Sequence, residues 1–95
     1  MAGKVTGKIT SFTEAGNAIT DIPVERLAAA PRDTSVAIRC DEHETAGLFT
    51  AEHTEPEFTF LALLGASGYL ELVIVGESAK MMLGVRVGDG VTVKW

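Results

Sequence analysis

The stretch that decides the fold is Gly65–Val93, which reads GASGYLELVIVGESAKMMLGVRVGDGVTV. Residues Tyr69–Val75 are mostly β-branched, aromatic or leucine and are bounded by glycines, which is typical of a buried strand. Ser78, or Glu77 before it, can then begin a short helix, and Gly84 has the conformational freedom to end it. The stretch therefore predicts a strand followed by one short helix.

The end of the chain predicts a closing hairpin. Apolar and polar residues alternate over 85–87 and again up to Trp95, and Gly88-Asp89-Gly90 between them is a common hairpin-turn sequence. On the preceding helix, Met81 and Met82 are expected to fill gaps in the core.

The first half of the chain predicts shorter elements. We expect a strand with one buried face over Lys4–Thr10, a turn over Thr13–Asn17, and a helix over Val24–Ala30. Asp21 and Pro23 have the residue types that begin a helix, as a capping acceptor and a first-turn proline.

Further strands are expected over Ser35–Cys40, Ala46–Ala51 and Phe58–Leu64, the last pairing with Tyr69–Val75 as a hairpin. Six or seven short strands with one or two short helices predict a small mainly-β barrel. Residues 1–95 are expected to form a single domain.

Charge and cysteine usage narrow the class of protein. The net charge is −5, and the eight Lys and Arg residues are scattered along the sequence, with none between Arg39 and Lys80. Nucleic-acid binding needs clustered basic residues, so we expect none. The single cysteine, Cys40, allows no internal disulfide and favours a reducing compartment.

The start has no signal-peptide core, and Gly65, Ser67, Gly68 and Glu71 interrupt the apolar run 58–75, so a cytoplasmic protein without a membrane segment is expected.

Few residues suggest chemistry. His43 and His53 lie among acidic residues and could bind a divalent metal, but the spacing is not that of a zinc site, and a solvated acidic face is the preferred interpretation. Cys40 is interpreted as a buried structural cysteine because neighbouring carboxylates raise a thiol's pKa. We assign no catalytic residue and no metal ligand.

Two polar residues are better candidates for a binding site. Asn17 follows Gly16 in a turn, where Asn is favoured by the backbone alone, yet its amide also carries the donor and acceptor that match an adenine edge. Glu71 interrupts an apolar strand, either as a site residue or as a side chain that faces water.

Motifs along nearly the whole chain resemble the C-terminal domain of the S-adenosyl-L-methionine (SAM) hydroxide adenosyltransferase family, which includes the SAM-dependent fluorinases and chlorinases. That domain typically has Gly-Lys-Val, a Gly-Asn turn with Leu-Ile-Thr-Asn-Ile, then Gly-Tyr-Leu-Glu, Gly-Ser-Ala and Gly-Asp-x-Val. The matching residues here are Gly7-Lys8-Ile9, Gly16–Pro23, Ser67–Leu72, Glu77-Ser78-Ala79 and Val87–Val91.

The resemblance implies a barrel that forms one wall of a SAM pocket. In full-length relatives, which are trimers, the pocket lies between the barrel of one subunit and the larger catalytic domain of a neighbour. It further implies a homo-oligomer, a possible separate catalytic subunit, and SAM or adenosine as ligand. The candidate ligand-binding residues are Asn17, Ser67, Gly68, Tyr69 and Glu71. The family's catalytic Asp, Arg and His belong to the other domain, so this chain is not expected to hydrolyse SAM unaided.

Several positions depart from the family pattern. The Asp and Phe before Gly-Asn are Thr13 and Ala15, the Asn-Ser before Ser-Gly-Tyr is Gly65-Ala66, and the Asn that ends the strand is Val75. These replacements fall on ligand-facing positions, so the resemblance implies that SAM binding has been weakened or lost.

Three functional hypotheses follow. The first is a stand-alone, non-catalytic barrel that binds SAM or adenosine or completes the pocket of a separate catalytic subunit. The second is a small oxyanion-binding module of the molybdate type, which shares the Gly-Asp-x-Val segment, although no basic residue is expected near an anion pocket. The third is a purely structural homo-oligomeric domain.

Overall fold

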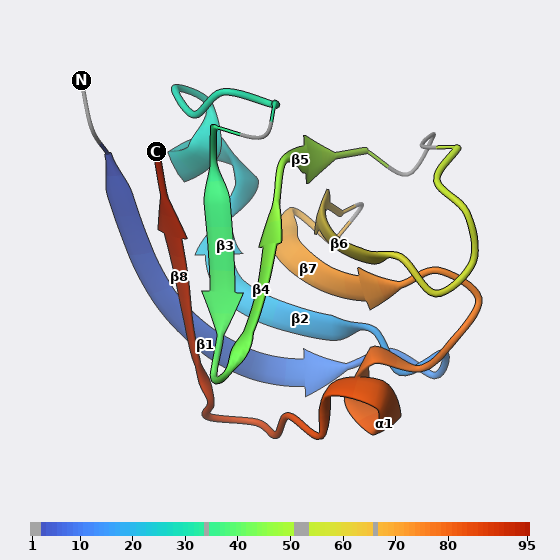
Figure 1. The fold of residues 1–95 in the computed structure, drawn as a ribbon. Coiled ribbons are helices and arrows are strands. Elements are labelled where there is room, and N and C mark those ends of the chain that lie inside the picture. Colours follow the sequence, from blue (N-terminus) through green and yellow to red (C-terminus); the bar gives the residue numbers. More distant parts are fainter. Residues whose placement is uncertain (1–2, 34, 51–53, 66) are drawn as a thin grey trace.

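The computed structural model describes residues 3–33, 35–50, 54–65 and 67–95, which form a sheet that curls into a nearly closed barrel (Figure 1). The expected mainly-β barrel is confirmed, with eight strands in the described residues instead of six or seven. The strands are β1 (Lys4–Phe12), β2 (Ala18–Pro23), β3 (Ala37–Cys40), β4 (His43–Ala46), β5 (Leu48–Phe49), β6 (Phe60–Leu64), β7 (Tyr69–Ile74) and β8 (Gly90–Lys94).

The strands follow one another in the order β4-β3-β8-β1-β2-β7-β6-β5. Neighbours are antiparallel except for the short β5, which runs parallel to β6. The sheet curls until β4 contacts β6, where the Thr45 hydroxyl donates a hydrogen bond to the carbonyl oxygen of Phe60 at 2.8 Å. Curling in this way covers strand edges at which another chain could pair.

Strand β1 joins two halves of the barrel, one formed by β8, β3 and β4 and the other by β2, β7, β6 and β5. Its first part, Lys4–Lys8, pairs with β8, and its second part pairs with β2. The register with β2 shifts between Ile9 and Ser11, and such an irregularity bends a strand. Figure 1 shows the result: β8, β3 and β4 lie along one axis and alternate in direction, and β2, β7 and β6 cross them at a steep angle.

The core is formed by the inward faces of both halves. Along β7, Leu70 and Leu72 are fully buried, as the alternation of side chains along a strand requires. The same cluster includes Ile9, Ile22, Leu27, Val36, Ile38, Val91 and Val93. Burial of each such side chain contributes about 1.5–3 kcal/mol, so the shared cluster holds the halves together.

The hairpin expected from Phe58–Leu64 and Tyr69–Val75 is confirmed. Strands β6 and β7 pair from Phe60 opposite Ile74 to Leu64 opposite Leu70. The expected first strand, which extends to Phe12, is also present.

The expected closing hairpin is wrong. Residues 84–86 are not in a strand, and the Asp89 backbone N–H donates to the carbonyl oxygen of Arg86 at 3.1 Å to form a tight turn. Strand β8 pairs with β1 and β3, which occupy both of its edges. Val85 is buried in the core whereas Val87 is 61% exposed. The alternation of apolar and polar residues over 85–87 therefore reflects a single contact, that of Val85 with the core.

The helix expected over Val24–Ala30 is a 3-10 helix of four residues, Val24–Leu27. Asp21 is not its cap, because it lies in β2 and its Oδ1 accepts a hydrogen bond from the Lys8 backbone N–H at 2.9 Å. Pro23 is the last residue of that strand. The expected helix has only seven residues between Pro23 and Pro31, and helices this short are unstable without strong packing.

The acidic stretch 41–57 contributes two strands, although one was expected over Ala46–Ala51. Strand β4 pairs with β3 from Cys40 opposite His43 to Ala37 opposite Ala46, and β5 follows directly. Residue 51, the end of the expected strand, lies outside the described residues. Low local hydrophobicity hid β4, which faces solvent on one side.

Helix α1 (Ala79–Leu83) begins and ends as expected. The Ser78 Oγ accepts a hydrogen bond from the Met81 backbone N–H at 3.3 Å, and Gly84 adopts φ 66°. The expectation for the methionines is wrong, because Met81 is 83% and Met82 54% exposed. A helix this short turns one stripe inward, here Ala79 and Leu83 at i and i+4.

Across the described part of the chain, no helix combines the length and apolar character needed to cross a membrane.

Candidate functional site

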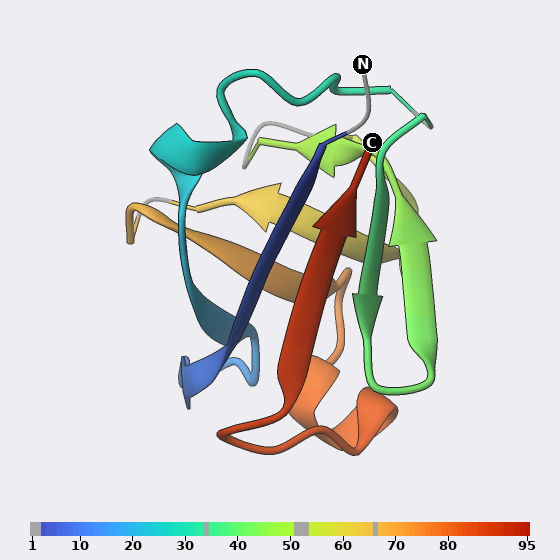
Figure 2. The ribbon, with the colours of Figure 1, turned by 90° about the vertical axis from the view of Figure 1, so that its left-hand side faces the viewer.

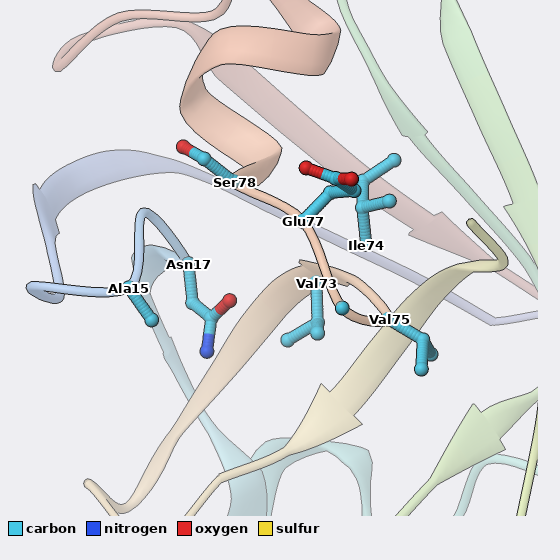
Figure 3. A pocket seen from close by; sticks show the side chains of 8 residues that line it. Ala15, Asn17, Val73, Ile74, Val75, Glu77 and Ser78 are labelled. Atoms are coloured by element: carbon cyan, nitrogen blue, oxygen red, sulfur yellow. The ribbon is translucent and has the colours of Figure 1, made fainter. Parts of the chain in front are cut away.

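A hollow of about 500 Å³ lies where the 13–17 turn meets the end of β7 and the segment that leads into α1 (Figure 3). The pairing of Ala18 with Leu72 brings the turn beside the strand end. The residues that line the hollow are Ala15, Asn17, Val73, Ile74, Val75, Gly76, Glu77 and Ser78.

Hydrogen bonds within the turn fix the position of Asn17. The Thr13 backbone N–H donates to the Asn17 carbonyl oxygen at 2.9 Å, and the Gly16 N–H donates to the Thr13 carbonyl oxygen at 2.9 Å. The Asn17 N–H donates to the Thr13 Oγ1 at 3.1 Å. These bonds use the backbone of Asn17 and leave its side chain out of the turn.

Gly16 attaches the turn to α1. Its φ is 90°, and a Cβ at this position would overlap the side chain of Ser78. The Lys80 backbone N–H donates to the Gly16 carbonyl oxygen at 2.9 Å. Only glycine fits such a close approach with a positive φ, so the turn and the helix start are held together as one wall of the hollow.

The Asn17 amide is one of two polar groups of this hollow that are available to a ligand, the other being the exposed carboxylate of Glu77. The side chain is half-buried, and no hydrogen bond of its amide occurs within the described part of the chain. Figure 3 shows the amide extending from the turn between Ala15 and Val73. An amide offers a donor and an acceptor side by side, and here apolar side chains flank it.

Glu71 is not a water-facing residue of β7. It is only 8% exposed and lies between Ile19 of β2 and Leu63 of β6 in the strand registers. The Ser67 hydroxyl donates a hydrogen bond to the Glu71 Oε2 at 2.9 Å. The carboxylate therefore has a local partner that holds it against the sheet, and a buried carboxylate without one would be costly.

The sequence-predicted site residues do not share one hollow: Asn17 lines the first, and Glu71 lines neither that hollow nor the second. Ser67 and Tyr69 line a second hollow of about 520 Å³, with Thr10, Ser11, Ile19, Thr20, Asp21 and Pro23. Gly68 lies at its margin, where its carbonyl oxygen accepts from the Val24 N–H at 3.0 Å. The distance along β7 from Leu72, which lies near the first hollow, to Tyr69 is about 10 Å. The two groups share one strand pair and lie toward its opposite ends.

Sequence reasoning missed the segment 76–78 as part of the Asn17 hollow. The helix-start signal at Glu77 and Ser78 was visible, but nothing in the sequence connected it with a turn sixty residues earlier. The pairing of β2 with β7 makes that connection.

The other candidate residues have structural roles. The ring Nε2 of His43 lies 2.8 Å from the carbonyl oxygen of Leu83 and ties β4 to the end of α1, while His53 lies outside the described residues. Cys40 is fully buried, as expected. Burial, with the charges of Asp89 and Asp41, raises the pKa of its thiol to about 11, the opposite of an activated nucleophile.

The fold and its hollows define a class of small, nearly closed β-barrel domains that carry a polar turn against a strand end. Within that class, the chain belongs to the SAM hydroxide adenosyltransferase C-terminal domain family, whose model matches residues 7–92. No curated protein matches the chain significantly.

Solved structures share the fold at low sequence identity. An uncharacterized conserved protein from Thermotoga maritima has a TM-score of 0.76 and 23% identity, covering 94% of this chain and 34% of its own. A conserved hypothetical protein from Thermus thermophilus has a TM-score of 0.69 and 23% identity, covering 93% of this chain and 34% of its own. This chain therefore spans about a third of each.

Proposed function

We propose that this barrel is a non-catalytic nucleoside-binding domain that holds the adenosine part of SAM, or adenosine itself, in the Asn17 hollow. The observation that supports it best is the Asn17 amide, which has no hydrogen-bond partner among the described residues and lies beside the apolar side chains of Val73 and Val75. An Asn amide can pair with the N6 and N7 edge of adenine, and apolar walls suit the faces of a purine.

The size and position of the hollow agree with this ligand. Its volume of about 500 Å³ lies in the usual range for small-molecule sites, about 300–1,000 Å³. Ala15 and Val75, two of the positions at which the sequence departs from the family's ligand-facing residues, both line it. These two replaced positions thus line the same space as Asn17, whereas Thr13 and Gly65 do not line it.

The replacements predict weak binding. Stacking of a base on an aromatic side chain contributes about 1–3 kcal/mol, and Ala15 stands where the family pattern has Phe. We propose that a catalytic domain or subunit encoded elsewhere completes the pocket and supplies the reacting groups, and that the barrel self-associates, as a trimer by analogy with the family. Ser67, Gly68 and Tyr69, at the second hollow, would then contact other parts of SAM or the partner, and the buried Glu71 would hold Ser67 in position.

Calorimetric titration with adenosine, SAM and inosine tests the ligand. Adenosine should bind, and Asn17→Ala should abolish the heat. Inosine should bind about tenfold more weakly, because its 6-oxo group cannot donate to the side-chain Oδ1 of Asn17 and a matched base contact contributes about 1–3 kcal/mol. Ala15→Phe should strengthen binding.

Arg26→Gln is the control, since Arg26 is exposed on the 3-10 helix and lines neither hollow, and it should leave adenosine binding unchanged. Absence of heat with adenosine and SAM at about millimolar concentration would contradict the ligand proposal, as would equal binding of adenosine by the Asn17→Ala variant.

A further inference from the structure

The outer face of β1, β8, β3 and β4, here called the basic face, carries the basic residues Lys4, Arg39 and Lys94, which are far apart in the sequence. Strand pairing sets Lys4 opposite Lys94, and Arg39 opposite Thr92. The four strands lie side by side in Figure 2. A hollow of about 200 Å³ on this face is lined by Lys4, Ala37, Arg39, Glu44, Thr92 and Lys94. The basic residues are scattered along the sequence, as stated above, but the fold brings three of them, Lys4, Arg39 and Lys94, to the lining of one hollow.

The two lysines repel each other. Directly opposite residues of an antiparallel pair have Cβ atoms about 4.5–5.5 Å apart, and like charges at such positions are destabilising. In the described part of the chain, neither lysine forms an ion pair with a carboxylate. An anion between them would convert this repulsion into attraction.

Arg39 and Thr92 supply directional donors beside the lysines. The Arg39 Nε donates to the Asp41 carbonyl oxygen at 3.1 Å, which anchors the guanidinium while its terminal N–H groups remain available. Thr92 carries a hydroxyl two residues before Lys94 on the same face of β8. Guanidinium and ammonium groups form charge-assisted hydrogen bonds with oxyanions.

We infer that this face binds a compact polyvalent oxyanion, a phosphate or the phosphate group of a small ester, through Lys4, Arg39 and Lys94. At about 200 Å³, the hollow is smaller than sites for drug-sized molecules. A single-stranded nucleic acid fits less well, because the lining residues include no aromatic side chain for stacking. The inference is independent of nucleoside binding in the Asn17 hollow.

Glu44 is the one acidic side chain that lines the hollow, and it lies opposite Arg39. Its carboxylate lowers the positive potential that an anion meets. Removing this charge should strengthen oxyanion binding, a direction of change that general destabilisation would not produce.

Calorimetric and thermal-shift titrations with sodium phosphate, at ionic strength held constant with sodium chloride, test the site. Phosphate should bind the wild-type chain, and Lys94→Gln should weaken binding about fivefold or more, whereas Glu44→Gln should strengthen it about twofold or more. Arg26→Gln, which removes one positive charge from the 3-10 helix, should leave binding unchanged. Sulfate and molybdate titrations distinguish a general oxyanion site from one selective for phosphate.

Stability without phosphate provides a second measurement. Lys94→Gln should raise the melting temperature by about 1–4 °C in chloride, since it removes the repulsion with Lys4, while reducing the shift that phosphate produces. Equal effects of chloride and phosphate, or equal weakening by Arg26→Gln and Lys94→Gln, would overturn the inference. Tight binding of an oligonucleotide without phosphate binding would overturn it too, and would assign the face to a nucleic acid.

Discussion

Gly65 and Glu71 illustrate how a single side chain constrains the hairpin of β6 and β7. A Cβ at Gly65 would overlap the Glu71 carboxylate, which is buried and accepts a hydrogen bond from Ser67. Glycine is needed here because the Glu71 side chain approaches the Gly65 backbone closely. The φ of Gly65 is not in the left-handed region, so backbone conformation is not the reason. In this chain, glycine at position 65 leaves room for the Glu71 carboxylate.

Gly65→Ala should destabilise the protein by about 1–3 kcal/mol, because the carboxylate must move and lose its partner. Gly90→Ala is the matched control: a Cβ there meets open space, and the change should be nearly neutral. Denaturant unfolding measures both. In a Glu71→Ala background the cost of Gly65→Ala should fall, and an unchanged cost would contradict the proposed contact.

Cys40 predicts a dependence of stability on alkaline pH. Its pKa is raised to about 11 in the folded protein, above the value of about 8.5 expected in an unfolded chain. Above about pH 9 the unfolded chain loses the thiol proton before the folded protein does, so stability is full at lower pH and falls toward pH 11, with a slope of at most about 1.4 kcal/mol per pH unit.

Urea unfolding of the wild-type chain and of Cys40→Ala between pH 8 and 11 isolates this effect, since Tyr and Lys residues titrate in both. The difference in stability between the two proteins should change with pH in this range. A constant difference would show that the thiol ionises equally in both states.

At the scale of elements, α1 shows which local signals are reliable. Its start and end follow from side-chain capping and a glycine, both of which depend on neighbouring residues only. The exposure of Met81 and Met82 depends on which stripe of the helix meets the barrel, and hydrophobicity does not determine this. The prediction of a closing hairpin was wrong for a similar reason, because the strands that pair with β8 are far away in the sequence.

Ser78→Ala should lower the stability of the protein by about 0.5–2 kcal/mol, the usual cost of removing a helix cap. Met81→Gln, on the exposed side of the same helix, should change it by less than about 0.5 kcal/mol. Thermal unfolding monitored by circular dichroism compares the two. A larger loss for Met81→Gln would show that Met81 is buried in solution.

Over the whole molecule, the sequence predicts the class of fold and the β6–β7 hairpin well, because the alternation of side chains and the turn residues are local features. The candidate site is only partly predictable. Asn17 was identified, but its hollow also requires Val73 and Ser78, which β2–β7 pairing brings to it. The basic face was missed entirely, since Lys4, Arg39 and Lys94 meet only through pairing across three strands.

The proposed nucleoside site at the 13–17 turn is tested residue by residue by titrating the isotopically labelled protein with adenosine and following the backbone amide NMR shifts. Adenosine should perturb Ala15, Asn17 and residues 73–78, and the Asn17→Ala variant should lose these perturbations. Perturbations confined to 67–71 or to the basic face, or none at all, would contradict the proposed site.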